Sequence, residues 1–125
     1  MLSSLKVLLV SSDPANRQLL KSLLEECHLS PVCCSTVRDA RTRLARRHVP
    51  VVFCEAQLTD GSFRDLLGAA DTTISKVVVT SRSGDTHEYV EAMSLGAFDY
   101  MSSPYRRSEV EWILSHVEET VGTAA

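Results

Sequence analysis

Side chains that can do chemistry end or directly follow four short apolar runs of this 125-residue chain. Glu55 is a carboxylate immediately after the run Val51–Cys54, and Asp13 lies shortly after another run. The other residues in such positions are Ser11, Ser12, Thr80, Ser81, Ser102, Ser103 and Pro104. Carboxylate and hydroxyl oxygens can bind a hard cation or hydrogen-bond a ligand. Such chemistry requires a fold that brings the ends of these runs together.

The histidines and cysteines do not point to a metal site or a catalytic nucleophile. The histidines are dispersed, without ligand spacing and without a nucleophile motif beside them. The cysteines form no Cys-x-x-Cys pair, and three fall in apolar runs, where cysteine is usually a small buried hydrophobe. These residues are His28, His48, His87, His116, Cys27, Cys33, Cys34 and Cys54. We therefore predict no metal ligands and no catalytic residues, and a chain that is not an enzyme.

Five apolar runs with helical patterns between them must position the candidate groups. The runs are continuous rather than alternating in hydrophobicity, which is typical of strands buried on both faces. The predicted strands are Lys6–Val10, Pro31–Cys34, Val51–Cys54, Lys76–Thr80 and Phe98–Met101. Right-handed crossovers then favour an α/β fold, a doubly wound parallel sheet with helices on both faces. We predict one domain over residues 1–125, with its core at about 5–121, and functional groups at the carboxyl ends of the strands.

Capping residues mark the predicted helices. Asp13 is the predicted N-cap of a helix that has Pro14 in its first turn and runs to about His28. Gly96 is the predicted terminator of the fourth helix. Four other pairs of capping residue and acid mark helix starts: Thr36 with Asp39, Ser62 with Asp65, Asp85 with Glu88, and Ser108 with Glu111. The predicted core faces are Leu19, Leu20, Leu23 and Leu24 in the first helix and Val110, Ile113, Leu114, Val117 and Val121 in the last.

Composition is that of an ordinary globular protein and does not select a partner. The chain is 44% hydrophobic and 23% charged, with a net charge of -3, which gives no general attraction to nucleic acid or membrane. Its apolar runs are too short to span a bilayer, and the N-terminus lacks a signal pattern, so we expect a cytoplasmic protein. Arginines make the second helix basic, at positions Arg38, Arg41, Arg43, Arg46 and Arg47. They lie opposite the predicted buried side and lack interleaved aromatic residues, so ordinary solvation is favoured over nucleic-acid binding.

Four segments together resemble the receiver domain of response regulators, the CheY-like family. The segments are "VLLVSSDPANRQLL", "FCEAQLTDGSFRDLL", "VVVTS" and "LGAFDYMSSPY", and the colinear pattern covers residues 5–121. The resemblance implies a flavodoxin-like sheet of strand order 2-1-3-4-5. It also places the phosphoacceptor position at Glu55, the acidic pocket at Ser11, Ser12 and Asp13, and the switch positions at Thr80 and Tyr100. The family's lysine position falls on Ser103, followed by Pro104, and the bond between these two is expected to be cis.

The departures from the family pattern fall on the groups that its phosphoryl chemistry needs. Magnesium is usually held by carboxylates, yet Ser11 and Ser12 are neutral, so we expect Mg²⁺ binding to be lost or very weak and no cofactor to be bound. Glu55 is one methylene longer than aspartate, where a misplacement of about 1 Å can cost about 100-fold in rate. Ser103 removes the cation that offsets developing charge. As a helix N-cap, Asp13 cannot simply replace the missing acids.

Two positions keep alternative interpretations. Glu55 is either a built-in anion that holds an active-like state or a relic whose charge points into solvent, and the second is slightly favoured. Thr80 either closes on an anion at Glu55 and draws Tyr100 inward, as the family's switch pair does, or is only structural. Tyr100, Tyr105 and Trp112 lie in or near the fourth helix, fifth strand and fifth helix, the face that the family uses for partners and dimers, although packing explains any one of them.

The sequence thus predicts a degenerate pseudo-receiver in two-component or phosphorelay signalling, acting through protein interactions without phosphorylation. The resemblance implies a histidine kinase, an output domain or another receiver as partner, or a homodimer through the face just named, without membrane contact. One alternative is an active phosphoacceptor with an atypical site at Glu55 or a nearby serine. Another is a nucleic-acid-binding module that uses the arginine-rich second helix.

Overall fold

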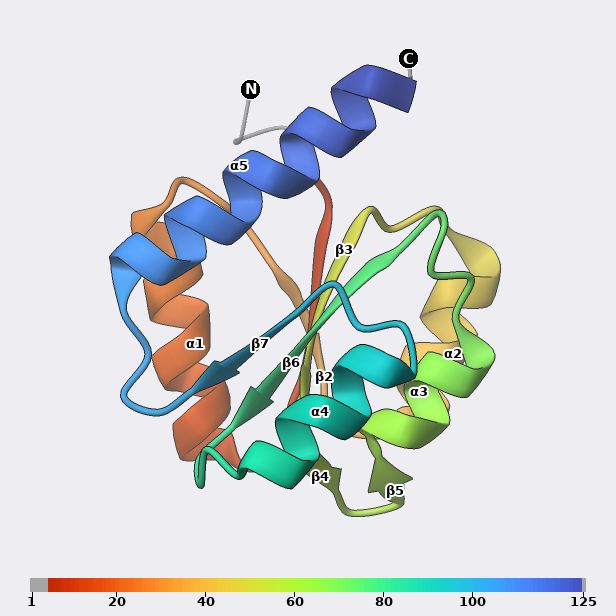
Figure 1. Ribbon diagram of the computed structural model, residues 1–125, viewed down its shortest axis with the longest axis vertical. Coiled ribbons are helices and arrows are strands. Elements are labelled where there is room, and N and C mark those ends of the chain that lie inside the picture. Colours follow the sequence, from red (N-terminus) through yellow and green to blue (C-terminus); the bar gives the residue numbers. More distant parts are fainter. Residues whose placement is uncertain (1–4, 125) are drawn as a thin grey trace.

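The computed structural model describes residues 5–124, with side chains for residues 5–117, and has three layers (Figure 1). The side chain of Val121, predicted to be in the core, lies outside the described residues. The elements in chain order are β1 (Val7–Val10), α1 (Pro14–Glu26), β2 (Val32–Cys34), α2 (Val37–Arg46), β3 (Val51–Glu55), β4 (Gln57–Leu58), β5 (Gly61–Ser62), α3 (Phe63–Ala69), β6 (Lys76–Ser81), α4 (Thr86–Ser94), β7 (Asp99–Ser102) and α5 (Arg107–Ala124).

The central sheet has five parallel strands in the order β2-β1-β3-β6-β7. Counting the predicted strands in chain order, this is 2-1-3-4-5, so the predicted doubly wound, flavodoxin-like α/β fold is confirmed. Helices α1 and α5 cover one face, and α2, α3 and α4 cover the other (Figure 1). Both faces of the central strands are therefore apolar, because β1 and the first four residues of β3 are buried throughout.

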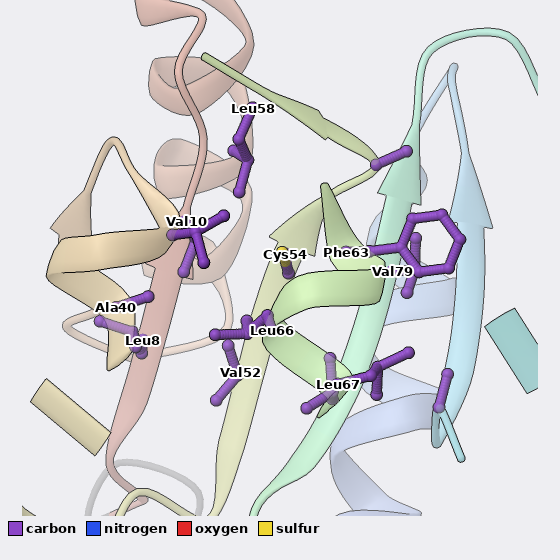
Figure 2. Packing of buried hydrophobic residues seen from close by; sticks show 14 of the residues in the cluster. Leu8, Val10, Ala40, Val52, Cys54, Leu58, Phe63, Leu66, Leu67 and Val79 are labelled. Atoms are coloured by element: carbon purple, nitrogen blue, oxygen red, sulfur yellow. The ribbon is translucent and has the colours of Figure 1, made fainter. Parts of the chain in front are cut away.

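Two hydrophobic clusters lie on opposite faces of the sheet. Figure 2 shows the cluster beneath α2 and α3, where Val52 and Cys54 from β3 meet Ala40, Phe63 and Leu66. In the other cluster, alternate strand residues such as Phe53 pack against Leu20 and Leu24 of α1 and Ile113 of α5. Successive side chains of β3 point to opposite faces of the sheet, which decides the helix layer that each residue contacts. Glu55, the last residue of β3, lies at the carboxyl edge of the sheet.

Most of the predicted helix caps are present. Asp13, Thr36 and Asp85 are N-caps, and Ser62 forms a capping box with Asp65. Gly96, with φ of 101°, follows the C-cap Leu95, and α4 itself ends at Ser94. The fourth predicted pair is wrong: α5 begins at Arg107, and the carbonyl of Arg106 accepts the N–H groups of Glu109 and Val110. Ser108 therefore lies inside the first turn instead of capping it.

The predicted core face of α1 is wrong at one position. Leu20 and Leu24 are fully buried, and Leu23 packs partly against the same cluster, but Leu19 is 55% exposed. The buried stripe begins instead at Asn16, one turn before Leu20. Residues four apart share a helix face, whereas Leu19 is offset by about 100° from Leu20. The polar Asn16 thus takes a place in the inward-facing row.

A two-stranded antiparallel hairpin, β4 with β5, was not predicted from the sequence. Asp60 lies in its turn and accepts the N–H groups of Val37 at 2.8 Å and Arg38 at 3.0 Å. These backbone hydrogen bonds lower the pKa of Asp60. The hairpin follows β3 and thereby ties the loop after Glu55 to the start of α2. No helix among the described residues combines the length and the apolar character that a membrane span needs.

Candidate functional site

The carboxyl ends of the central strands meet at one edge of the sheet. In the register, Val10 pairs with Cys54, Glu55 pairs with Thr80, and Ser81 pairs with Ser102. The residues that follow these strands therefore share one rim, as parallel topology requires. Ser11, Glu55, Thr80 and Ser81 are buried there, unlike the exposed Ser103.

Glu55 lies inside this rim and not in solvent. Its side chain is only 4% exposed. Ser11 Oγ donates to Oε1 at 2.8 Å, Asn16 Nδ2 donates to Oε2 at 3.1 Å, and Arg82 Nε lies 3.4 Å from Oε2. The interpretation of Glu55 as a relic that points into solvent is therefore wrong, because the carboxylate is buried. These three polar contacts offset the desolvation of the carboxylate. We name this group of four residues, with Asp13, the Glu55 pocket.

Asp13 uses its two carboxylate oxygens for different purposes. Oδ1 accepts the backbone N–H of Ala15 at 2.9 Å and of Asn16 at 3.4 Å, which is the predicted N-cap. Oδ2 accepts Arg82 Nη1 at 2.5 Å. Both oxygens of this acid are thus hydrogen-bonded within the protein.

Ser11 and Ser12 point to different neighbours although they are adjacent. Ser11 donates into the pocket, to Glu55. Ser12 Oγ donates to the carbonyl of Ser35 at 2.5 Å and accepts the N–H of Thr59 at 3.0 Å. Ser12 therefore joins the loops after β2 and β4, whereas Ser11 hydrogen-bonds to Glu55.

Thr80 and Tyr105 bring two buried hydroxyls close to the pocket. Neither Thr80 Oγ1 nor Tyr105 OH has a hydrogen-bond partner among the residues that the structure describes. Burial raises the pKa of Tyr105, and the charge of Glu55 adds to this rise, while neighbouring Asn16 and Thr80 oppose it. The hydroxyl of Tyr105, expected only on a partner face, therefore lies beside the pocket.

Tyr100, expected at a switch position, contacts α4. Its hydroxyl donates to Glu88 Oε1 at 2.7 Å, and its ring packs edge-on against Tyr89 with centroids 5.6 Å apart. Burial raises the pKa of Tyr100, and its contacts with Ser81, which lowers the pKa, and with Glu88, which raises it, also contribute. The Tyr100 hydroxyl thus hydrogen-bonds to Glu88 of α4. The tyrosine hydroxyl that lies near Thr80 is that of Tyr105.

The remaining predicted residues lie outside the pocket. Ser103 is exposed, its backbone N–H donates to the carbonyl of Ser81 at 2.9 Å, and its peptide bond to Pro104 is cis. Trp112 is 56% exposed and packs on His116 with ring centroids 3.9 Å apart. Of the three aromatic residues expected on a partner face, Tyr100 and Tyr105 are partly buried and Trp112 is exposed.

Sequence reasoning missed two members of the pocket, Asn16 and Arg82. Arg82 follows Ser81 at the end of β6, so its position at the functional edge was a usable signal. Asn16 lies three residues after the N-cap, on the row that continues into Leu20, and a polar residue in an inward-facing row is itself a signal.

Two buried hydroxyls, that of Ser11 in the Glu55 pocket and that of Thr80 beside it, provide a matched test of these contacts. Thr80→Val removes a buried hydroxyl that lacks a protein partner, so we expect stability to stay unchanged or rise by up to about 1 kcal/mol. Ser11→Ala removes a donor to the buried Glu55 carboxylate and should cost about 1–3 kcal/mol. Urea unfolding of both variants checks the difference. A cost for Thr80→Val equal to that of Ser11→Ala would contradict the assignment.

Comparisons with known proteins agree with this fold. No family model matches the chain. A relative is the two-component response regulator ORR21 of Oryza sativa, 30% identical over 116 residues; the match covers 90% of this chain and 17% of that protein. The chain thus spans less than a fifth of this relative's length.

Solved structures give the same result for the fold. A response regulator receiver domain protein from Clostridium thermocellum superposes with a TM-score of 0.87 at 18% identity, covering 97% of this chain and 99% of that one. The beryllofluoride-activated NtrC4 receiver domain dimer superposes with a TM-score of 0.79 at 24% identity, covering 92% of this chain and 98% of that one. The chain is thus similar in sequence to two-component response regulators, and its fold is that of CheY-like receiver domains.

Proposed function

We propose that this chain is a receiver-type module of two-component signalling that acts by binding protein partners and does not accept a phosphoryl group. The proposal rests on the burial of Glu55 and on its contacts. Its carboxylate is buried and bound by Ser11, Asn16 and Arg82. A carboxylate nucleophile must instead be accessible to the incoming phosphorus, in line with the leaving group.

The oxygen atoms of the pocket do not fit the Mg²⁺ ion that the family's chemistry implies. Mg²⁺ requires near-octahedral oxygen ligands and is usually held by carboxylates. Here both oxygens of Asp13 are bonded to protein donors, and the neighbouring positions are the neutral Ser11 and Ser12. The described residues also contain no cluster of three histidine, cysteine or acidic side chains suited to a metal. We infer that the domain has no resident metal.

A protein partner is the ligand class that the exposed surface favours. α4 presents three large apolar side chains to solvent, Tyr89, Val90 and Met93, and exposed Trp112 adds an aromatic on α5. Large exposed apolar side chains, aromatic ones above all, are favoured interface anchors. The surface of α4, β7 and α5 would therefore bind a histidine kinase, an output domain, a second receiver or another copy of the chain. One neighbour in fold, the NtrC4 receiver domain, is itself a dimer.

A second candidate function, nucleic-acid binding, has one observation in its favour. The arginines of α2 are exposed, and Lys6, Arg43, Arg46 and Arg47 line a groove of about 1180 Å³ beside β2. Neutralising phosphates with such a surface makes binding fall steeply with salt. A gel shift at low salt that disappears when Arg46 and Arg47 become glutamate would favour this function over protein binding.

The proposed function is tested by exposing the chain to a small-molecule phosphodonor with Mg²⁺ and measuring its intact mass. We expect no mass increase, because the pair of metal-binding acids, the acceptor aspartate and the lysine are all replaced, by Ser11, Ser12, Glu55 and Ser103. A receiver with an ordinary aspartate site, treated in parallel, controls for donor quality. A stable phosphoryl adduct that peptide mapping locates at Glu55 or a neighbouring serine would replace the proposal with an active phosphoacceptor.

A further inference from the structure

Arg82 links two carboxylates that come from different parts of the fold. Its Nη1 lies 2.5 Å from Oδ2 of Asp13, at the start of α1, and its Nε lies 3.4 Å from Oε2 of Glu55, at the end of β3. The two acids are 28% and 4% exposed, respectively, whereas Arg82 is 61% exposed. The exposed guanidinium thus lies on the solvent side of both acids, hydrogen-bonded to Asp13 and in ion-pair contact with Glu55.

The contact between Arg82 and Glu55 matters because it balances a buried charge. Ser11 and Asn16 also bind Glu55, but both are neutral donors. Arg82 forms the ion pair to Glu55 in the part of the chain that the structure describes. A carboxylate taken out of water without a compensating charge is strongly disfavoured. One cation between two carboxylates is therefore what keeps the pocket's charge low.

The turn after β6 holds Arg82 in this position. Ser81 Oγ accepts the backbone N–H of Ser83 at 3.2 Å and of Gly84 at 3.3 Å, and Gly84 has a φ of 67°. Gly84 supports this conformation without side-chain strain. The planar guanidinium spreads its charge over three nitrogens, so Nη1 can hydrogen-bond to Asp13 while Nε lies within ion-pair distance of Glu55. Arginine at this position suits two acids on different elements.

We propose that Arg82 is the built-in cation of the Glu55 pocket, where its guanidinium takes the charge-balancing place of a divalent metal and holds Asp13 and Glu55 together. This inference rests on the proposed function, in which the pocket accepts no phosphoryl group. Arg82 fixes the loop between β6 and α4 to α1 in a single state that needs no metal. It also weakens the binding of divalent cations to the wild-type pocket, because it contacts the acids' oxygens and repels positive charge.

The test measures Mn²⁺ binding to the full chain by paramagnetic broadening of amide NMR signals. Three variants are compared with the wild type: Arg82→Ala, Arg82→Lys, and Arg41→Ala as a matched control on the solvent-exposed side of α2. We expect Arg82→Ala to raise Mn²⁺ affinity at Asp13 and Glu55 about tenfold or more, because it removes a positive charge a few ångströms from the ion. Arg82→Lys should remain near the wild type, and Arg41→Ala should match it.

A double-mutant cycle separates charge balance from simple packing. We expect Arg82→Ala to lower the melting temperature by several degrees when Glu55 is present. In the Glu55→Gln background the same change should have a much smaller effect, because no buried charge then needs a partner. Equal losses in both backgrounds, together with unchanged Mn²⁺ affinity, would overturn the role of Arg82. The proposed function fails instead if the wild type acquires a phosphoryl adduct, so the two failures are distinct.

Discussion

A variant that carries Ser11→Asp, Ser12→Asp, Glu55→Asp and Ser103→Lys is expected to accept a phosphoryl group where the wild type accepts none. The two new aspartates supply carboxylate ligands for Mg²⁺, the shorter acceptor restores the distance of attack, and the lysine offsets developing charge. The strand ends that bear these positions already meet at one edge of the sheet. The readout is intact mass after incubation with a phosphodonor and Mg²⁺.

Glu55→Asp alone is the matched control for this gain. We expect it to stay inert, because Ser11 and Ser12 still offer no carboxylate to a metal. The fourfold variant should also melt at a higher temperature when Mg²⁺ is added, because the ion binds only the folded state. A fourfold variant that is folded, gains stability from Mg²⁺ and yet remains unphosphorylated would show that the four departures are not the reason for inactivity.

Leu20→Ala is expected to lower the free energy of unfolding by about 2–5 kcal/mol, the largest stability loss that we predict for a single residue. Leu20 is fully buried against the sheet with Phe53 and Ile113 in the same cluster, so truncation leaves a cavity. Because folded domains are stable by only about 5–15 kcal/mol in total, this loss is large. Urea unfolding monitored by circular dichroism measures it.

Leu19→Ala is the internal control, one position earlier in the same helix. Leu19 is 55% exposed, so the same chemical change should alter stability by no more than about 0.5 kcal/mol. Helix propensity is nearly equal in the two substitutions, so burial alone separates them. Comparable losses at both positions would mean that α1 is rotated relative to the sheet.

Short-range patterns in the sequence were sufficient to predict the strands and helices of the architecture. Continuous apolar runs such as Val51–Cys54 predicted strands buried on both faces, and Asp13 with Pro14 predicted the start of α1. These signals are short-range, since they depend on neighbouring residues and on the period of one element. The strand order followed from the resemblance to receiver domains and is the order observed.

Residue patterns and the resemblance to receiver domains were enough to predict the fold, and with it the edge of the sheet at which Ser11, Glu55 and Thr80 meet. The burial of Glu55 and its contacts with Asn16 and Arg82 are visible only in three dimensions. The phase of α1, which exposes Leu19 and turns Asn16 inward, was decided in the same way. The physical reason is that a side chain's surroundings depend on segments far away in the chain, which pack together only after the layers have formed, whereas residue patterns report only periods and ends of single elements.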